Sequence, residues 1–163
     1  MTEKVNNHVY IIGAGPAGLI ASIFAARKGT SVTILESNPN SGRKLLLTGG
    51  RRCNLTHDVE PAQLIKLYGN GGKFLSFCIY EYSPDYVRDF FAQLGVDTKI
   101  EPDGCVFPKT YKAEDVNNAL VQKAKSLHVK FLFNKPVRDI VKQENGFLIK
   151  TKDEQYFADK AVD

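Results

Sequence analysis

The first third of the chain places one amphipathic segment between two short apolar runs. Residues 9–12 form the first run, and residues 31–36 form a second run that ends in an acid. Continuous apolar runs of this length are typical of strands buried in a parallel sheet. Between them, apolar side chains recur at helical spacing from Leu19, and Gly29 marks a natural end for that helix. The pattern predicts a strand–helix–strand unit.

The middle of the chain alternates between helical and short extended patterns. Residues 61–80 read as helical in pieces, interrupted by the stretch GNGG. Residues 83–94 form a clear helix, which Ser83 is placed to cap. Two short strands are expected within residues 98–108 around a Pro-Asp-Gly turn, and residues 112–128 predict an amphipathic helix.

Strand patterns dominate the last part of the chain. Residues 129–134 are expected to add a third parallel strand. Three short strands follow within residues 137–160, and the Asn145-Gly146 pair that joins the first two is a strong hairpin signal. Residues 158–163 begin what we interpret as a fourth parallel strand. The predicted fold class is therefore α/β, with a parallel sheet, helices and a β-meander.

Composition narrows the class of protein rather than its chemistry. A chain of 163 residues that is 43% hydrophobic can bury the core of one domain, so disordered and fibrous classes do not fit. The net charge of +4 is mild, so a nucleic-acid partner is not indicated. No long apolar run predicts a signal segment or a membrane span. The three cysteines lack metal-ligand and C-x-x-C spacing, so we expect no metal site and reduced thiols in a cytoplasmic protein.

The glycines after the first apolar run carry the most specific chemical signal. Gly13, Gly15 and Gly18 follow the G-x-G-x-x-G spacing of a dinucleotide-binding turn, between a strand and a helix. The first glycine allows the tight turn, the second lets a pyrophosphate approach the backbone, and the third lets helix and strand pack closely. Glu36, eighteen residues beyond Gly18, is placed to accept a hydrogen bond from a ribose hydroxyl.

Simpler interpretations of these residues stay open at this point. The glycines could form a turn in an unrelated α/β domain, and Glu36 alone would be an ordinary solvated charge at the end of a strand. The flanking strand, helix and acid favour the dinucleotide interpretation. An acid at position 36 also argues against a 2′-phosphate, and so against NADP at this site. The spacing does not separate FAD from NAD.

A long loop over residues 37–57 follows the acid. Loops of this length inside a compact domain tend to be functional. Arg43 and Lys44 come soon enough after Glu36 to reach the adenosine or pyrophosphate side of a dinucleotide. Gly49 and Gly50 would let a flat ring system or a phosphate approach the backbone.

The stretches GAGPAGL, ILESN, GRKLLLTGG and RCNLTH occur in this order along the chain, and DGCVFPKTYKAEDVNNAL follows later. This series resembles bacterial FAD-dependent flavoproteins of the aminoacetone-oxidase-like or NAD(P)/FAD-dependent oxidoreductase type. The resemblance covers almost the whole chain. It implies that residues 1–163 are the N-terminal part of a Rossmann-type FAD-binding domain, with the meander as its crossover. Family members are much longer, so we expect the remaining FAD segments and the substrate domain to be absent through truncation.

The resemblance also implies a set of cofactor-binding positions. The matching positions are Gly13, Gly15, Pro16, Ala17 and Gly18 in the phosphate turn, Glu36 as the ribose acid, Arg43 and Lys44 as the basic pair, and Thr48, Gly49, Arg52, Cys53 and Asn54 in the loop that lies against FAD. The backbone of Val137 would touch the adenine, with an ordinary strand residue as a nearly equal alternative. Three positions depart from the family pattern: Arg51 stands for a third glycine, His57 for an asparagine and Cys105 for an arginine.

The function that the resemblance implies is a two-electron oxidation or reduction of a small molecule by a flavin enzyme, with NAD(P)H as a candidate electron donor. No residue is assigned as a catalytic acid or base, and the oligomeric state is open. A non-catalytic dinucleotide-binding or regulatory module is the alternative. A nucleic-acid contact through Arg43, Lys44, Arg51 and Arg52 is a weaker alternative, because it would need a wider basic face.

Two side chains of the loop have competing interpretations. Cys53 has no partner cysteine four residues further on, which excludes the mechanism of the flavin disulfide reductases. Its thiol is then either a small group that fills a tight loop, which we favour, or a thiolate of low pKa beside two arginines. His57 is more often a hydrogen-bonding loop residue than a catalytic base.

Overall fold

The computed structural model describes residues 8–162, which divide into two compact units. The first unit combines residues 8–44 with residues 120–162, and the second unit contains residues 45–119. No helix within the described residues is long and apolar enough to cross a bilayer. The predicted α/β Rossmann-type class is confirmed in the first unit, because its main sheet is parallel and a helix joins its two central strands.

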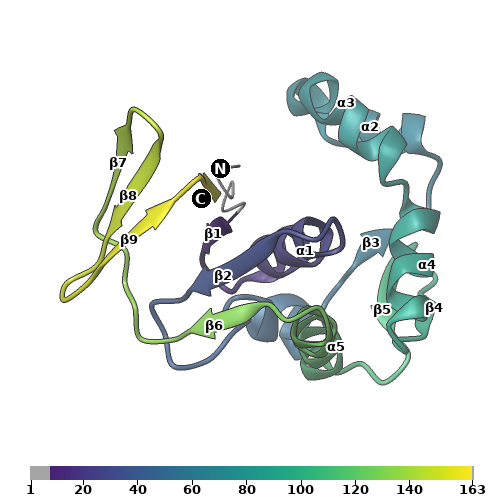
Figure 1. Ribbon diagram of the computed structural model, residues 1–163. Helices are drawn as coiled ribbons and strands as arrows, with labels where there is room; N and C mark the ends of the chain where they lie inside the picture. Colours follow the sequence, from purple (N-terminus) through teal and green to yellow (C-terminus); the bar gives the residue numbers. More distant parts are fainter. Residues whose placement is uncertain (1–7, 163) are drawn as a thin grey trace. The chain divides into compact units, whose positions relative to one another are not determined.

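The main sheet of the first unit has four parallel strands (Figure 1). Their order across the sheet is β10 (Lys160–Val162), β1 (His8–Ile12), β2 (Ser31–Leu35) and β6 (Lys130–Leu132). Each neighbouring pair runs parallel. The third and fourth parallel strands expected from the sequence are thus present, although β6 is shorter than the predicted 129–134. The backbone of Asn134 has a φ of +57°, which extended strand geometry does not allow.

Helix α1 (Pro16–Ala26) connects β1 to β2 and packs on both strands. Proline is suited to the first turn because the first amides of a helix have no intrahelical acceptor. Leu19 and Ile23 lie one turn apart and are fully buried, so this stripe is the face that covers the sheet. Strand β2 is buried along its length after its first residue, as expected of a central strand in a parallel sheet.

A three-stranded antiparallel meander follows β6, and Figure 1 shows it in green to yellow. Its strands are β7 (Asp139–Gln143), β8 (Gly146–Lys150) and β9 (Gln155–Ala158). The backbone at Gly146 has a φ of +152°, and a Cβ there would lie 2.3 Å from the carbonyl oxygen of Ala158. This position therefore requires glycine. The predicted hairpin is present, but its two turn residues are Glu144 and Asn145, because Gln143 pairs with Gly146. Leu35, Ile149 and Ala158 form a buried cluster that joins the meander to β2.

The second unit contains short helices and one small antiparallel sheet. The sheet order is β3 (Thr56–His57), β5 (Cys105–Pro108) and β4 (Thr98–Ile100). The helices are α2 (Pro61–Leu67), α3 (Gly72–Glu81) and α4 (Pro84–Gln93), with 3₁₀ segments at Leu45–Arg51 and Gly69–Gly71. The predicted cap at Ser83 is confirmed, because its Oγ accepts a hydrogen bond from the Tyr86 amide at 3.2 Å. Helix α5 (Ala113–Ser126) begins in this unit and ends in the first.

The buried cluster of the meander generates a stability prediction. Ile149 on β8 is 0% exposed, whereas Phe157 on the neighbouring strand β9 is 53% exposed. We expect Ile149→Ala to lower the free energy of unfolding by about 2–5 kcal/mol, because it leaves a cavity in the core. Phe157→Ala is the matched control and should cost about 0.5–1 kcal/mol. Urea unfolding followed by circular dichroism measures both, and equal losses would contradict the assigned core.

Candidate dinucleotide-binding site

The turn between β1 and α1 lies at the carboxyl end of the central strands of the first unit. Gly13 adopts a φ of +96°, a conformation that side-chain-bearing residues rarely take. Its amide donates a hydrogen bond of 2.7 Å to the carbonyl oxygen of Leu35, the last residue of β2. The turn is thereby fixed against the neighbouring strand. Carboxyl ends of strands are where open parallel sheets bind ligands.

Gly18 and Gly15 serve different steric purposes in this turn. A Cβ at Gly18 would lie 2.0 Å from the carbonyl oxygen of Gly13, so no larger residue fits between helix and turn. A Cβ at Gly15 would meet nothing within 4 Å, and the backbone there is extended, with φ −75° and ψ 176°. Gly18 is therefore required by packing, whereas the space beside Gly15 is open to a ligand.

The first turn of α1 presents amides to this open space. Gly15 is the N-cap residue and its carbonyl accepts the first intrahelical hydrogen bond, from Leu19 at 2.9 Å. The amides of Ala17 and Gly18 precede that bond, and Pro16 has no amide hydrogen. No acidic side chain lies in this first turn. Such a helix start favours an anion through its amides and its dipole.

Glu36 directly follows β2 and is 7% exposed. Its Oε2 accepts a hydrogen bond of 2.6 Å from the amide of Ala14, in the glycine turn. Its Oε1 accepts from the amide of Asn38 at 2.8 Å, from the Asn38 side-chain Nδ2 at 2.7 Å and from the Ser37 hydroxyl at 3.2 Å. The acid is therefore bound to the turn on one side and to its own loop on the other.

The hydrogen bonds of Glu36 decide its ionisation. Burial raises the pKa of this carboxyl, but the hydrogen bonds from Ala14, Asn38 and Ser37 outweigh burial, so its pKa lies below the ordinary value. A carboxyl whose pKa is lower in the folded than in the unfolded chain contributes stability above the unfolded pKa. That contribution disappears as the pH falls through the folded value. Glu36 is thus held as a carboxylate near neutral pH.

Within residues 8–162, the two carboxylate oxygens of Glu36 differ in the number of hydrogen bonds that they accept. An ionised carboxylate offers about four lone-pair positions, two on each oxygen. From the described residues, Oε1 accepts three hydrogen bonds, whereas Oε2 accepts one. Oε2 therefore retains a position for a hydroxyl donor, beside the glycine turn.

The loop after Glu36 brings the predicted basic pair to the same region. The amide of Gly42 donates a hydrogen bond of 2.9 Å to the carbonyl oxygen of Ala14, so this loop is fixed to the glycine turn. Arg43 donates from Nη1 to Oδ1 of Asn38 at 3.0 Å, and Lys44 is exposed. Sequence analysis did not single out Asn38. The signal available was a short amide side chain two residues after the acid, a position from which such groups bond back to their neighbours.

Val137 lies two residues ahead of β7 rather than inside a strand. Its side chain packs against the cluster of Leu35, Ile149 and Ala158. The segment before it is tied to the acid, because the Lys135 amide donates a hydrogen bond of 2.8 Å to the Glu36 carbonyl oxygen. The first unit thus contains the glycine turn, Glu36, Arg43 and Val137.

The other predicted residues, Thr48, Gly49, Arg52, Cys53 and Asn54, belong to the second unit. Their loop has consecutive left-handed residues: φ is +54° at Gly49, +65° at Gly50 and +70° at Arg51. The departure at Arg51 therefore leaves a side chain where the backbone favours glycine. The loop is otherwise exposed, except for Cys53, whose φ is +61° and which is 5% exposed.

Arg52 is bound within its own unit. Its Nε donates to the Gly49 carbonyl oxygen at 3.1 Å, and its Nη1 lies 3.4 Å from Glu101 Oε1. The guanidinium also lies 4.3 Å from the ring centroid of the buried Phe107. A Cβ at Gly49 would come within 3.2 Å of the same ring. Arg52 and Phe107 thus hold the glycine loop in place.

Two competing interpretations from the sequence can now be compared with the structure. Burial raises the pKa of the Cys53 thiol, against a smaller opposing effect of its hydrogen bond with Thr48. This favours a neutral thiol that fills the loop rather than a reactive thiolate.

His57 lies in β3, opposite Cys105, and its ring covers Gly104, where a Cβ would come within 2.6 Å of Nε2. It is a strand residue rather than a loop residue.

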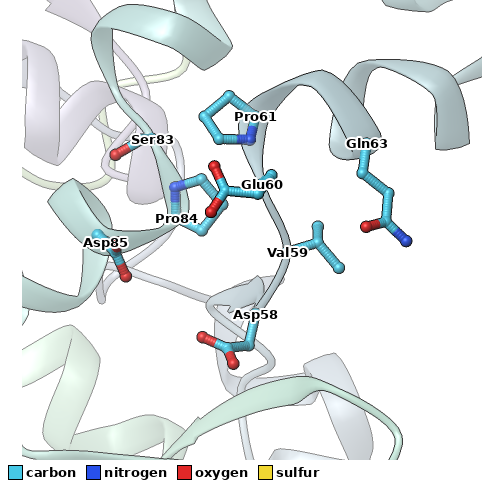
Figure 2. A pocket seen from close by; sticks show the side chains of 8 residues that line it. All are labelled: Asp58, Val59, Glu60, Pro61, Gln63, Ser83, Pro84 and Asp85. Carbon is cyan, nitrogen blue, oxygen red and sulfur yellow. The ribbon is translucent and has the colours of Figure 1, made fainter.

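A cavity of about 490 Å³ in the second unit contains none of the predicted site residues. Figure 2 shows that its walls come from the chain leading into α2 and from the start of α4. Its lining residues are Asp58, Val59, Glu60, Pro61, Gln63, Ser83, Pro84 and Asp85. Arg88 lies 3.3 Å from Asp58 and 3.5 Å from Asp85, and so neutralises part of this acidic wall.

Among the described residues, no group of histidine, cysteine and acidic side chains is arranged to hold a metal ion.

The steric difference between the two glycines yields a second prediction. Gly18→Ala should lower the free energy of unfolding by about 1–3 kcal/mol or more, because its Cβ must displace a backbone oxygen. Gly15→Ala, at an ordinary φ and in open space, should leave stability within about 0.5–1 kcal/mol of the parent chain. Chemical unfolding of both variants measures this. Equal stability of the two variants would show that the turn is packed differently.

Curated proteins are similar to this chain in sequence. The 3-dehydro-bile acid delta(4,6)-reductase of Clostridium scindens is 31% identical over 158 residues, which are 96% of this chain and 38% of that protein. The ribosomal RNA dihydrouridine synthase of Escherichia coli is 29% identical over 85% of this chain and 34% of its own length. The chain therefore spans little more than a third of these curated relatives.

Solved structures share the fold at low sequence identity. The 3-ketosteroid-delta4-(5alpha)-dehydrogenase from Rhodococcus jostii RHA1, in complex with 4-androstene-3,17-dione, matches with a TM-score of 0.69 and 17% identity. The match covers 98% of this chain and 46% of that one. Residues 7–162 match the family described as the HI0933-like protein Rossmann domain, which is almost the entire chain. The chain belongs to this family of FAD-binding Rossmann domains.

Proposed function

We propose that this chain is the FAD-binding portion of a flavin-dependent oxidoreductase that carries out a two-electron oxidation or reduction of a small molecule. The observation that supports the proposal is the position of the Glu36 carboxylate, whose Oε2 accepts the Ala14 amide, beside the glycine turn and the first turn of α1. A ribose hydroxyl and a pyrophosphate are the two groups that this pair of features suits.

The residues of the first unit fit the adenosine diphosphate half of FAD. The amides after Gly15 hold the pyrophosphate, Gly15 itself leaves room for it, and Glu36 accepts the ribose hydroxyl. Pro16 and Ala17 set the direction of the helix start. Arg43 and Lys44 add positive charge at the rim, and the backbone of Val137 borders the adenine.

The loop of the second unit has a separate role in the proposal. Thr48, Gly49 and Asn54 are exposed residues and are proposed to contact the cofactor, while Arg52 and Cys53 hold the shape of the loop. FAD supplies hydride chemistry when it is bound, and the protein supplies binding and orientation. Among the described residues, none is assigned a proton-transfer role.

The substrate class and electron donor belong to the whole protein. A small-molecule substrate and an NAD(P)H donor are the expectations that follow from the aminoacetone-oxidase-like type. The name of the bile acid reductase relative agrees with a small molecule, whereas the name of the dihydrouridine synthase relative points to ribosomal RNA. Two of the four cations of the nucleic-acid alternative are engaged within the chain, Arg43 with Asn38 and Arg52 with Glu101. This favours a small-molecule substrate over a contact with a nucleic-acid backbone.

Replacing Glu36 tests the ribose contact. Glu36→Gln keeps the shape of the side chain but replaces one of its two acceptor oxygens with an NH₂ group. One end of the side chain then places a donor against the donor that it formerly accepted. A hydrogen bond to a charged group contributes about 1.5–3 kcal/mol, so affinity for FAD should fall about tenfold or more. Fluorescence titration measures the affinity. Glu114→Gln, an equal charge change at the exposed start of α5, should leave it unaltered.

The oxidoreductase assignment has its own experiment. The purified full-length protein should show the visible absorbance of flavin, and an electron donor should bleach that absorbance anaerobically. A protein that binds FAD but is never reduced by NADH or NADPH, and never reoxidised by a substrate, would instead support the non-catalytic module.

A further inference from the structure

Asn38 is bonded through all of its polar groups. Its amide and its Nδ2 both donate to Glu36 Oε1, at 2.8 and 2.7 Å. Its Oδ1 accepts a hydrogen bond of 3.0 Å from Arg43, and its carbonyl oxygen accepts one of 3.2 Å from the Asn134 amide. The side chain is half-buried and is bonded on both ends of its amide group.

The two side-chain partners determine which way the amide of Asn38 points. Arg43 carries only donors, so it requires the oxygen of the amide, whereas an ionised Glu36 only accepts and requires the nitrogen. Rotating the amide by half a turn would set oxygen against carboxylate and nitrogen against guanidinium. Arg43 therefore fixes Asn38 in the orientation that holds Glu36.

We propose that Asn38 is a positioning residue for ribose recognition: it holds Glu36 Oε1 in the loop and so aims Oε2 at the ribose hydroxyl. This rests on the proposed function, since Glu36 has a ribose to recognise only if the site takes a dinucleotide. Asn38 acts through Glu36 rather than by touching the ligand. Both donors of Asn38 bind Oε1, and within the described residues Oε2 accepts from the Ala14 amide alone.

The loop after β2 is also bonded to the segment between β6 and β7, and these bonds do not depend on the Asn38 side chain. Asn134 donates to the main-chain carbonyl of Asn38, and Lys135 donates to the main-chain carbonyl of Glu36. Any residue at position 38 can keep the first of these bonds. Replacing the side chain therefore removes the Nδ2 donor to Glu36 Oε1, while the Asn38 amide, the Ser37 hydroxyl and the path of the backbone are retained.

The decisive variant is Asn38→Asp. It replaces the donor at 2.7 Å from Glu36 Oε1 with an acceptor, and two carboxylates at that distance repel each other. Asn40→Asp is the matched control, because Asn40 lies two residues away in the same loop and is exposed. Both variants change the net charge equally, so a difference between them reports position rather than charge.

The experiment compares the affinity of the chain for ADP and for 2′,3′-dideoxy-ADP, which lacks the ribose hydroxyls, by isothermal titration. The parent chain should prefer ADP by about tenfold or more, the size of one hydrogen bond to a charged group. Asn38→Asp should reduce this preference to about twofold or less, while Asn40→Asp should keep it. Circular dichroism confirms that each variant is folded.

A second variant covers the case in which Asn38→Asp does not fold. Asn38→Ala removes one of the hydrogen bonds that lower the pKa of Glu36, so its carboxyl should protonate at a higher pH. The ADP preference of Asn38→Ala should therefore disappear at a higher pH than that of the parent chain or of Asn40→Ala. If Asn38 had a purely structural role, the pH at which the ADP preference disappears would be the same in Asn38→Ala and in the parent chain.

The outcomes separate the two claims. If the parent chain prefers ADP and the Asn38 variants keep both that preference and its pH profile, the positioning role is wrong while the ribose site stands. If the parent chain itself makes no distinction between the two nucleotides, the proposed ribose site is wrong, and the role of Asn38 is refuted with it.

Discussion

The hydrogen bond from the Ala14 amide to Glu36 Oε2, at 2.6 Å, joins the turn after β1 to the end of β2. Around it, the Gly13 amide is bonded to the last carbonyl of β2, and the Gly42 amide to the carbonyl of Ala14. The turn after β1 and the loop after β2 thereby meet at the carboxyl end of the parallel sheet. Their mutual positions depend on this contact, because it places a charged side chain of one loop against the backbone of another.

The electrostatics of this junction follow from the same contact. A buried carboxyl would ordinarily take up a proton, but donors from the turn and from the following loop keep Glu36 ionised. Helix α1 begins at Pro16, two residues after Ala14, and no acidic side chain in its first turn opposes the positive end of its dipole. A negatively charged acceptor and an anion-binding helix start therefore stand side by side, which is the combination that the ribose and phosphate groups of a nucleotide require.

The sequence predicted the elements whose rules are local. The requirement for glycine at Gly18 follows from the spacing of the turn, and the structure gives its cause in the carbonyl of Gly13. The Ser83 cap likewise depends on neighbouring residues, whereas glycine at position 146 is required by the carbonyl of Ala158 on the next strand.

What the sequence could not supply depends on partners that are distant along the chain. Strand β3 is two residues long and exists because β5 pairs with it. Arg52 lies over Phe107, and no periodicity connects these two positions. At the candidate site, the spacing identified Glu36 as an acceptor but not the donors that occupy it, because Asn38 acts through rotamers that only the folded loop defines.

The most direct test of the central claim is to titrate the isotopically labelled chain with ADP and follow each backbone amide by nuclear magnetic resonance. We expect the largest shifts on the amides of the glycine turn and on those that follow Glu36, namely Ala14, Gly15, Ala17 and Gly18 together with Ser37 and Asn38. Amides at the opposite end of the strands, such as Gly29 and Lys130, should be nearly unaffected. Shifts concentrated at that opposite end, or in the acidic cavity of the second unit, would contradict the assignment of the site.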